Sequence, residues 1–295
     1  MTTVQEALAD AVRCLSLAGV ADADREAVWL LAHVLQTSAG TVRARGREPV
    51  PPAAAGTYSE MVARRSQREP LQYILGTEEF MGMTFKVTPA VLIPRLDTET
   101  LVRESAALLQ GAVRVADIGT GSGAVAIGLA RLLPQAQVVA VDISPAALAI
   151  ARENAEANGV GTRVEFRVGD LLEPLRGVLF DAIVSNPPYI GEAEWECLMP
   201  EVRCFEPKGA LTPGKDALLY YRQLARGSRE LLRAGGFLAV EVGYDQSAAV
   251  ADLFSASGFA VATHLDTGGC SRVVIGYTRE KNGKPAGGVP AGCRS

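Results

Sequence analysis

The chain has 295 residues, of which 48% are hydrophobic and 21% are charged, and its formal net charge is −4. These values are typical of a soluble globular protein with one large domain or two modest ones. The slight acidic excess disfavours a protein that coats DNA, because such proteins usually carry a basic face.

The five cysteines, at 14, 197, 204, 270 and 293, are scattered and contain no CxxC pair. We therefore expect free thiols in a reducing compartment and no metal site. The first residues resemble neither a signal peptide nor a transit peptide, and no run of about 18 uncharged apolar residues occurs. These features predict a cytoplasmic protein without a membrane span.

Helical spacing of apolar residues predicts helices over 3–19, 22–36 and 54–69, with Thr3 and Asp22 as N-caps. We therefore predict a small helical domain over residues 1–71. Between 41 and 70 there are six arginines against three glutamates, which indicates a solvated face or, alternatively, a docking patch.

A β-hairpin around Gly76–Thr77 is predicted for residues 72–87, so residues 72–88 would link the helical domain to the rest of the chain. A further helix, 97–110, is predicted to open at Asp97-Thr98-Glu99.

From residue 112 strands and helices alternate, which predicts an α/β domain over 89–280 with a doubly wound, mostly parallel sheet. The last two strands are joined by a link too short for a helical crossover, so the last strand should be antiparallel. Residues 281–295 are predicted to be a disordered tail. The seven expected strands are 113–118, 137–142, 163–168, 179–185, 236–242, 259–265 and 272–278, and the expected helices are 123–133, 145–158, 216–233 and 245–257.

A glycine-rich turn at the end of the first of these strands predicts a cofactor site. Glycine lets the backbone turn sharply and approach a ligand. Asp142 ends the next strand, where a carboxylate can hold ribose hydroxyls, and Asp170 with Leu171 could hold and cover an adenine edge. A glycine pattern alone fits either a nicotinamide cofactor or S-adenosylmethionine. The turn residues are Asp117, Gly119, Thr120, Gly121, Ser122 and Gly123.

Asn186-Pro187-Pro188-Tyr189 follows an apolar strand and is the most informative motif. Two prolines end the strand and remove two backbone donors, so Asn186 is held at the strand's carboxyl end. The Asn186 side-chain oxygen and the backbone carbonyls beside it are hydrogen-bond acceptors, and the two prolines add no competing donor. Such a site is suited to bind an NH2 group. Together with a G-x-G-x-G spacing, this favours methyl transfer to nitrogen over hydride transfer.

These segments resemble class I S-adenosylmethionine-dependent methyltransferases, and more closely the release factor glutamine methyltransferases (the PrmC/HemK family). The resemblance covers residues 3–279 and includes Pro70–Gly76, Glu79–Phe85 and Leu92–Glu99. Phe205-Glu-Pro207 and Glu241-Val-Gly243 complete it. Three positions depart from the family pattern: Leu96 in place of proline, Ala217 in place of glycine, and Leu171 in place of an aromatic residue.

The resemblance implies methylation of the glutamine amide in the Gly-Gly-Gln loop of peptide chain release factors. It implies a cofactor site that includes Gly119, Gly121, Gly123, Asp142, Leu171 and Asn186, with a substrate clamp at Asn186–Tyr189. The partner would be a release factor, with no membrane and no direct nucleic-acid partner.

An amide nitrogen is a poor nucleophile because its lone pair is delocalised into the carbonyl. The side-chain oxygen of Asn186 and the Pro187 carbonyl would each accept one N–H, and Tyr189 would exclude water. We expect no strong base. Arg95 and Glu99 could shape the substrate pocket or form a structural ion pair, and Glu206 and Glu241 carry the same ambiguity.

Three alternatives remain open from the sequence. The acceptor could be a glutamine on a ribosomal protein, which a related family methylates with the same clamp. It could be an adenine N6 of nucleic acid, although the chain has no spare basic domain for a flipped base. A non-catalytic cofactor-binding protein is disfavoured by the intact Asn-Pro-Pro-Tyr.

Overall fold

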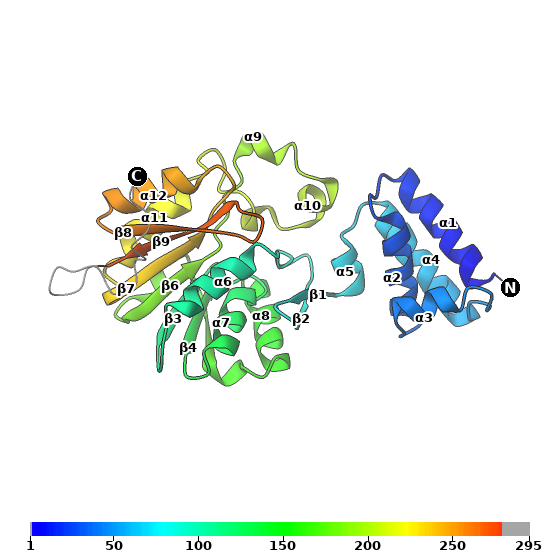
Figure 1. Ribbon diagram of the computed structural model, residues 1–295, viewed down its shortest axis with the longest axis horizontal. Helices are drawn as coiled ribbons and strands as arrows, with labels where there is room; N and C mark the ends of the chain where they lie inside the picture. Colours follow the sequence, from blue (N-terminus) through cyan, green and yellow to red (C-terminus); the bar gives the residue numbers. More distant parts are fainter. Residues whose placement is uncertain (1, 279–295) are drawn as a thin grey trace. The chain divides into compact units, whose positions relative to one another are not determined.

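The computed structural model describes residues 2–278, so the predicted tail at 281–295 lies outside the described residues. The chain forms two compact units (Figure 1). Among the described residues, a helical unit comprises residues 2–77 together with Met199–Phe205, and an α/β unit comprises Glu78–Leu198 and residues 206–278. The segment 199–205 therefore packs with helices that precede it by more than 120 residues in sequence.

The helical unit is held by apolar faces that meet in one core, with Leu15, Leu30 and Leu31 fully buried. Thr3 caps the first helix through a capping box with Glu6, as predicted, whereas Asp22 stands at the cap of the second helix without a side-chain hydrogen bond. Its helices are α1 (Val4–Leu17), α2 (Ala23–Val34), α3 (Ala39–Ala44), α4 (Pro52–Ser66), α5 (Leu71–Leu75) and α10 (Pro200–Phe205).

The β-hairpin begins later than its sequence predicts. Residues 71–75 form the short helix α5, which ends at Gly76 in the left-handed conformation with φ +79°. The strands β1 (Thr77–Phe80) and β2 (Met83–Lys86) follow, and the turn lies at Met81-Gly82, where both φ angles are positive. Gly76 is thus a helix terminator and not the hairpin turn.

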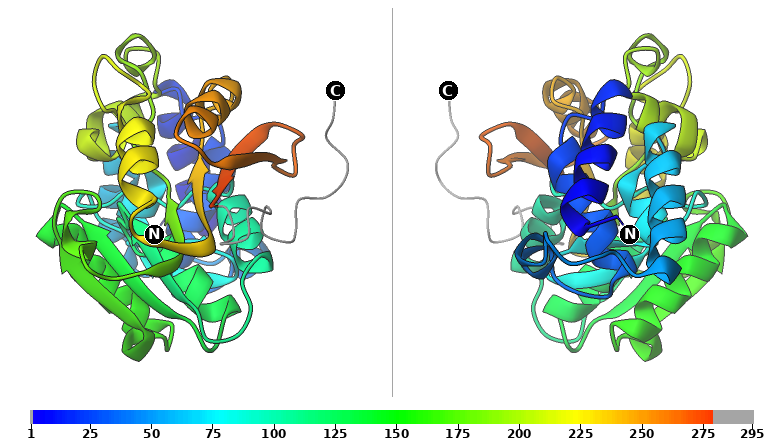
Figure 2. Two further views of the ribbon diagram at one scale, coloured as in Figure 1. Left: turned by 90° about the vertical axis from the view of Figure 1, so that its left-hand side faces the viewer. Right: turned by 90° about the vertical axis from the view of Figure 1, so that its right-hand side faces the viewer.

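A seven-stranded sheet forms the α/β unit, with strand order β5-β4-β3-β6-β7-β9-β8. Every pair from β5 to β7 is parallel, and β9 runs antiparallel to both β7 and β8, as predicted. The orange-red hairpin of β8 and β9 lies at the edge opposite the green strands β4 and β5 (Figure 2). The strands are β3 (Arg114–Ile118), β4 (Gln137–Asp142), β5 (Val164–Val168), β6 (Phe180–Ser185), β7 (Leu232–Glu241), β8 (Ala260–Leu265) and β9 (Ser271–Tyr277).

Helices cover both faces of this sheet, because successive strand residues point to opposite sides. Val115 and Ala182 join the core beneath α6 (Thr98–Ala107), α7 (Ala124–Leu132) and α8 (Pro145–Ala157). Ala116 and Ile183 join the core beneath α11 (Leu219–Ser228) and α12 (Ser247–Ala256). The two helix layers are visible in Figure 1.

Short elements complete the α/β unit: α9 (Glu192–Trp195) and the 3-10 turns η1 (Gly161–Arg163), η2 (Glu173–Leu175) and η3 (Lys208–Ala210). Within residues 2–278, no helix has the length and apolar character that a bilayer span requires.

Candidate functional site

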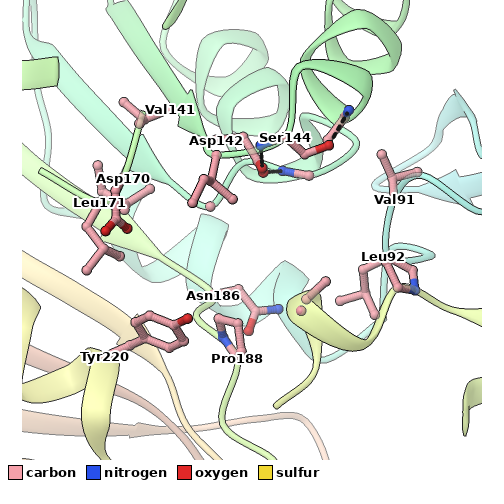
Figure 3. A pocket seen from close by; sticks show the side chains of 18 of the residues that line it. Val91, Leu92, Val141, Asp142, Ser144, Asp170, Leu171, Asn186, Pro188 and Tyr220 are labelled. Carbon is pink, nitrogen blue, oxygen red and sulfur yellow. Dashed lines mark hydrogen bonds between the residues drawn. The ribbon is translucent and has the colours of Figure 1, made fainter. Parts of the chain in front are cut away.

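A pocket of about 250 Å³ opens at the carboxyl ends of β3, β4, β5 and β6, the edge where parallel sheets bind ligands. In Figure 3, Asp142 and Ser144 lie across the pocket from Asn186 and Pro188, with Asp170 and Leu171 at one end. Seven predicted site residues line it: Gly119, Gly121, Asp142, Asp170, Leu171, Asn186 and Pro188.

The glycine turn wraps the end of β3 around the pocket. Gly119, Gly121 and Gly123 have φ angles of +72°, +55° and +86°, a region that side chains disfavour. Gly123 also sits against α7 and α8, since a Cβ there would lie 2.9 Å from Ile127 Cδ1. The turn therefore needs glycine for its backbone shape and, at Gly123, for packing.

Asp142 ties this turn to the neighbouring strand. Its Oδ2 accepts a hydrogen bond from the Gly121 N–H at 2.9 Å, and its Oδ1 accepts one from the Ser144 N–H at 2.9 Å (Figure 3). Each carboxylate oxygen keeps a further lone pair for a ligand hydroxyl.

Asp117, Thr120, Ser122 and Gly123 do not line the pocket but support the turn from within the core. Asp117 Oδ2 accepts hydrogen bonds from the Thr120 hydroxyl at 2.6 Å and the Ala126 N–H at 3.0 Å. Complete burial raises the pKa of the Asp117 carboxyl to about 7, because the charged form is poorly solvated there.

Asp170 and Leu171 follow β5 and close one end of the pocket. Leu171 has φ +47°, which is uncommon for a residue with a branched side chain. This backbone turn places the Leu171 side chain on the pocket wall. The carboxylate of Asp170 lies at the same end (Figure 3).

Asn186 lines the pocket, and its Nδ2 donates to the Thr98 hydroxyl at 3.1 Å. Pro188 also lines the pocket, whereas Pro187 and Tyr189 do not. The Tyr189 hydroxyl instead donates to Glu241 Oε1 at 3.3 Å, and its backbone carbonyl accepts from Gln246 Nε2 at 2.9 Å.

Arg95 and Glu99 lie outside the pocket lining and make separate ion pairs. Arg95 pairs with Glu206, whose second oxygen accepts from the backbone N–H of Ile93 at 3.1 Å. Glu99 pairs with Arg103 at 2.8 Å and accepts from the Met81 N–H at 2.9 Å. Both side chains thus hold chain segments together.

Several lining residues were not predicted from the sequence. Ile143 is 70% exposed although it is large and apolar, and it directly follows Asp142, which is the signal that could have indicated it. Tyr220 is carried by α11, and no motif marks it (Figure 3). The remaining unpredicted lining residues include Ala90, Val91, Leu92, Pro207, Gly209 and Ala210.

The donor set fits a nucleoside-bearing cofactor. Carboxylates at two strand ends suit ribose hydroxyls and a base amino group, and the apolar surface of Ile143 and Leu171 suits a flat ring. Glycines at 119 and 121 leave space where a Cβ would otherwise stand. Within residues 2–278, no group of three or more His, Cys, Asp or Glu side chains is placed to hold a metal ion.

Known families match both units of the chain. Residues 6–76 match the PrmC N-terminal domain, and residues 94–224 match the methyltransferase small domain. A release factor glutamine methyltransferase of Moorella thermoacetica is 46% identical over 283 residues, covering 95% of this chain and 100% of that protein. The chain belongs to the release factor glutamine methyltransferase family.

A second member, from Geobacter sulfurreducens, is 47% identical over 259 residues and covers 88% of this chain and 90% of its own length. The protein is therefore a methyltransferase whose methyl donor is S-adenosylmethionine, as its motifs predicted. A solved methyltransferase from Pyrococcus furiosus shares the fold, with a TM-score of 0.54 and 18% identity over 74% of this chain and 98% of that chain.

Proposed function

We propose that this protein methylates the side-chain amide nitrogen (N5) of the glutamine in the Gly-Gly-Gln loop of peptide chain release factors. The observation that carries the proposal is the Asn186 side chain at the pocket wall, with its Nδ2 already bonded to Thr98. This leaves Oδ1 as the end that can accept an N–H. The curated relatives named release factor glutamine methyltransferases support this acceptor.

The pocket residues would hold S-adenosylmethionine. Gly119 and Gly121 would admit its close approach to the backbone, and the Asp142 carboxylate would accept the ribose hydroxyls. Asp170 and Leu171 would hold and cover the adenine. When bound, the cofactor supplies a methyl group made electrophilic by a sulfonium centre.

The chain's own task is to hold the acceptor nitrogen. A primary amide presents two N–H groups, and the Asn186 Oδ1 and the Pro187 carbonyl would accept one each. Pro187 and Pro188 have no N–H, so neither supplies a backbone donor that competes for these acceptors. A nitrogen held by two acceptors is fixed in position and biased toward pyramidal geometry, which frees its lone pair for reaction.

Tyr189 would complete the acceptor side by covering the amide plane and excluding water. Its bonds to Glu241 and Gln246 fix the ring and the backbone of the motif. Arg95 would act indirectly through its ion pair with Glu206, and Glu99 through the hydrogen bond that it accepts from the Met81 N–H.

The helical unit, proposed as residues 1–71, would dock the protein substrate, with the hairpin linking it to the catalytic domain. We place the reaction in the cytoplasm, with a release factor as the partner and no direct nucleic-acid contact. A ribosomal-protein glutamine is the alternative acceptor, because the same clamp would serve it.

The test is incubation with methyl-labelled S-adenosylmethionine and three separate acceptors: a release factor, a ribosomal protein fraction and duplex DNA. We expect label on the release factor, located on its Gly-Gly-Gln glutamine by mass spectrometry. Label on ribosomal protein or DNA alone would contradict the proposed acceptor.

A further inference from the structure

We propose that Thr98 and Glu241 are positioning residues that fix which end of the Asn186 side-chain amide faces the acceptor nitrogen. This inference rests on the proposed function, because it explains how Asn186 presents an oxygen and not an NH2 group. The oxygen and nitrogen ends of an Asn side chain have nearly equal size. Only its hydrogen-bond partners can therefore select one orientation over the other.

The partner of the nitrogen end is Thr98, at the first turn of α6. Its hydroxyl accepts from Asn186 Nδ2 at 3.1 Å. Thr98 is 4% exposed, so water does not compete for this bond. With Nδ2 engaged in this way, Oδ1 is the end left for the substrate.

A threonine hydroxyl alone cannot enforce this choice, because it can donate as well as accept. If it donated to Asn186, the amide would turn over and present its NH2 to the substrate. The Thr98 hydrogen must therefore be committed elsewhere. A carboxylate is the partner suited to take it, since an ionised carboxylate accepts and never donates.

Glu241, at the end of β7, provides that carboxylate. It is 1% exposed, and the Thr98 hydroxyl acts to lower the pKa of its carboxyl, which places the two groups close together. Its Oε1 accepts from Tyr189, whereas Oε2 has no hydrogen-bond partner among the described residues. In the inferred arrangement, this buried and unpartnered oxygen accepts the Thr98 hydroxyl hydrogen, which leaves the hydroxyl oxygen to accept from Asn186 Nδ2.

The surrounding charges are balanced around Glu241. The pKa of its carboxyl is raised to about 7, chiefly by burial and also by Asp97, whereas Thr98, Arg272 and Tyr189 act to lower it. Arg272 is shared with Asp97, at 3.1 Å, and with Asp266, at 3.4 Å. The Tyr221 hydroxyl donates to the backbone carbonyl of Glu241 at 3.0 Å and to Gln246 Oε1 at 3.2 Å. The Arg272 guanidinium favours the ionised form against the cost of burial, so the orientation that this form enforces should prevail above about pH 7.

A spectroscopic experiment tests the orientation without any acceptor. The chain contains four asparagines, at 154, 158, 186 and 282, so selective ¹⁵N-asparagine labelling gives four side-chain NH2 groups. The Asn186 signal is assigned by its loss in Asn186→Asp. Asn154 is an internal reference, because its Nδ2 donates to the carbonyls of Lys86 and Ser122.

In Thr98→Val, which removes the hydroxyl but keeps the shape, we expect the Asn186 NH2 signals to shift and to exchange faster with water. Thr98→Ser keeps the hydroxyl and should retain the wild-type signals. Glu241→Gln should disturb the Asn186 signals while Asn154 is unchanged. Unchanged Asn186 signals in Thr98→Val and Glu241→Gln would overturn the inference, whatever the acceptor of the enzyme is.

Kinetics then test the consequence on a release factor. Thr98→Val should lower kcat about 10- to 100-fold, the size expected for one lost buried hydrogen bond, with the affinity for S-adenosylmethionine unchanged. Thr98→Ser should restore most of the rate. Wild-type turnover by Thr98→Val would overturn the inference, whereas a wild-type enzyme that leaves the release factor unlabelled would refute the proposed function instead.

Discussion

Gly123 is the position in the cofactor turn where both the backbone conformation and the packing require glycine. Substitution by alanine should impose a left-handed conformation on a side chain and press its Cβ against Ile127 and Ala151. We expect Gly123→Ala to lower the free energy of unfolding by about 2–4 kcal/mol. Urea denaturation measures this change.

Gly177→Ala is the matched control, because Gly177 has φ +81° but nothing within 4 Å of an added Cβ. Gly177→Ala should lose only the stability that the left-handed backbone conformation costs a side chain, about 1–2 kcal/mol. Equal losses in the two variants would show that packing at Gly123 is unimportant.

Asp117 gives the fold a dependence on pH. Its pKa is about 7 in the folded protein against an ordinary value of 3.8, so the folded state binds a proton that the unfolded state releases between these values. Stability from this group is therefore fully present below about pH 4 and is lost as the pH rises through 7.

Asp117→Asn removes this titration while keeping an oxygen acceptor for Thr120 and Ala126. The measured quantity is the difference in the free energy of unfolding, wild type minus variant. This difference should fall as the pH rises from 5 to 7, by at most about 1.4 kcal/mol per pH unit. Glu241 titrates in both proteins and cancels in this difference. A difference that is constant from pH 5 to 8 would contradict the buried, protonated Asp117.

At the level of residues, the sequence predicts the part of the site whose chemistry is local. Glycines in a turn and an acid at a strand end are recognisable because the backbone there requires them. Tyr220 and Thr98 could not be predicted in this way, because each comes from a helix whose position depends on tertiary packing. Arg95 and Glu99 do not form the structural ion pair that the sequence allowed: Arg95 pairs with the distant Glu206, and Glu99 pairs with Arg103 one turn on in α6.

Among the elements, α10 is joined to the helical unit by a buried charge cluster. Arg65 of α4 pairs with Glu26 of α2 and with Glu201 of α10, the latter at 3.0 Å, and its side chain is 6% exposed. Arg68 also binds Glu201, at 2.7 Å. Part of the arginine-rich stretch is thus an internal anchor and not a solvated face.

Arg65→Met should leave two nearly buried carboxylates with too little compensation and lower the free energy of unfolding by about 2–4 kcal/mol. Arg43→Met is the control, because the Arg43–Asp24 pair is 60% and 80% exposed and should contribute under about 1 kcal/mol. Thermal or urea unfolding compares the two, and similar losses would contradict an anchoring role for Arg65.

Strand positions were predictable because buried parallel strands are continuous apolar runs, so all seven expected strands are present within a few residues. The short helix α5 was mistaken for a strand, since five apolar-rich residues cannot distinguish the two periodicities. Helices α3, α9 and α10 were missed for a related reason: they have six, four and six residues, too few to show a period.

For the whole molecule, the two units have separate hydrophobic cores. Every residue of the pocket belongs to the α/β unit. S-adenosylmethionine should therefore slow amide hydrogen exchange at residues 119–123, 142–144 and 169–171, and leave residues 4–66 unchanged. Hydrogen-exchange mass spectrometry reads both regions at once, and protection that begins in the helical unit would contradict a cofactor site confined to one unit.

The acceptor clamp is tested most directly by the rate at which Asn186→Ala methylates a release factor under saturating S-adenosylmethionine. The rate is read by mass spectrometry of the Gly-Gly-Gln peptide. We predict a rate about 10²–10³ times lower than wild type, by analogy with removing one group that stabilises a transition state, and unchanged cofactor affinity. A glutamine that is methylated by Asn186→Ala at the wild-type rate would contradict the clamp.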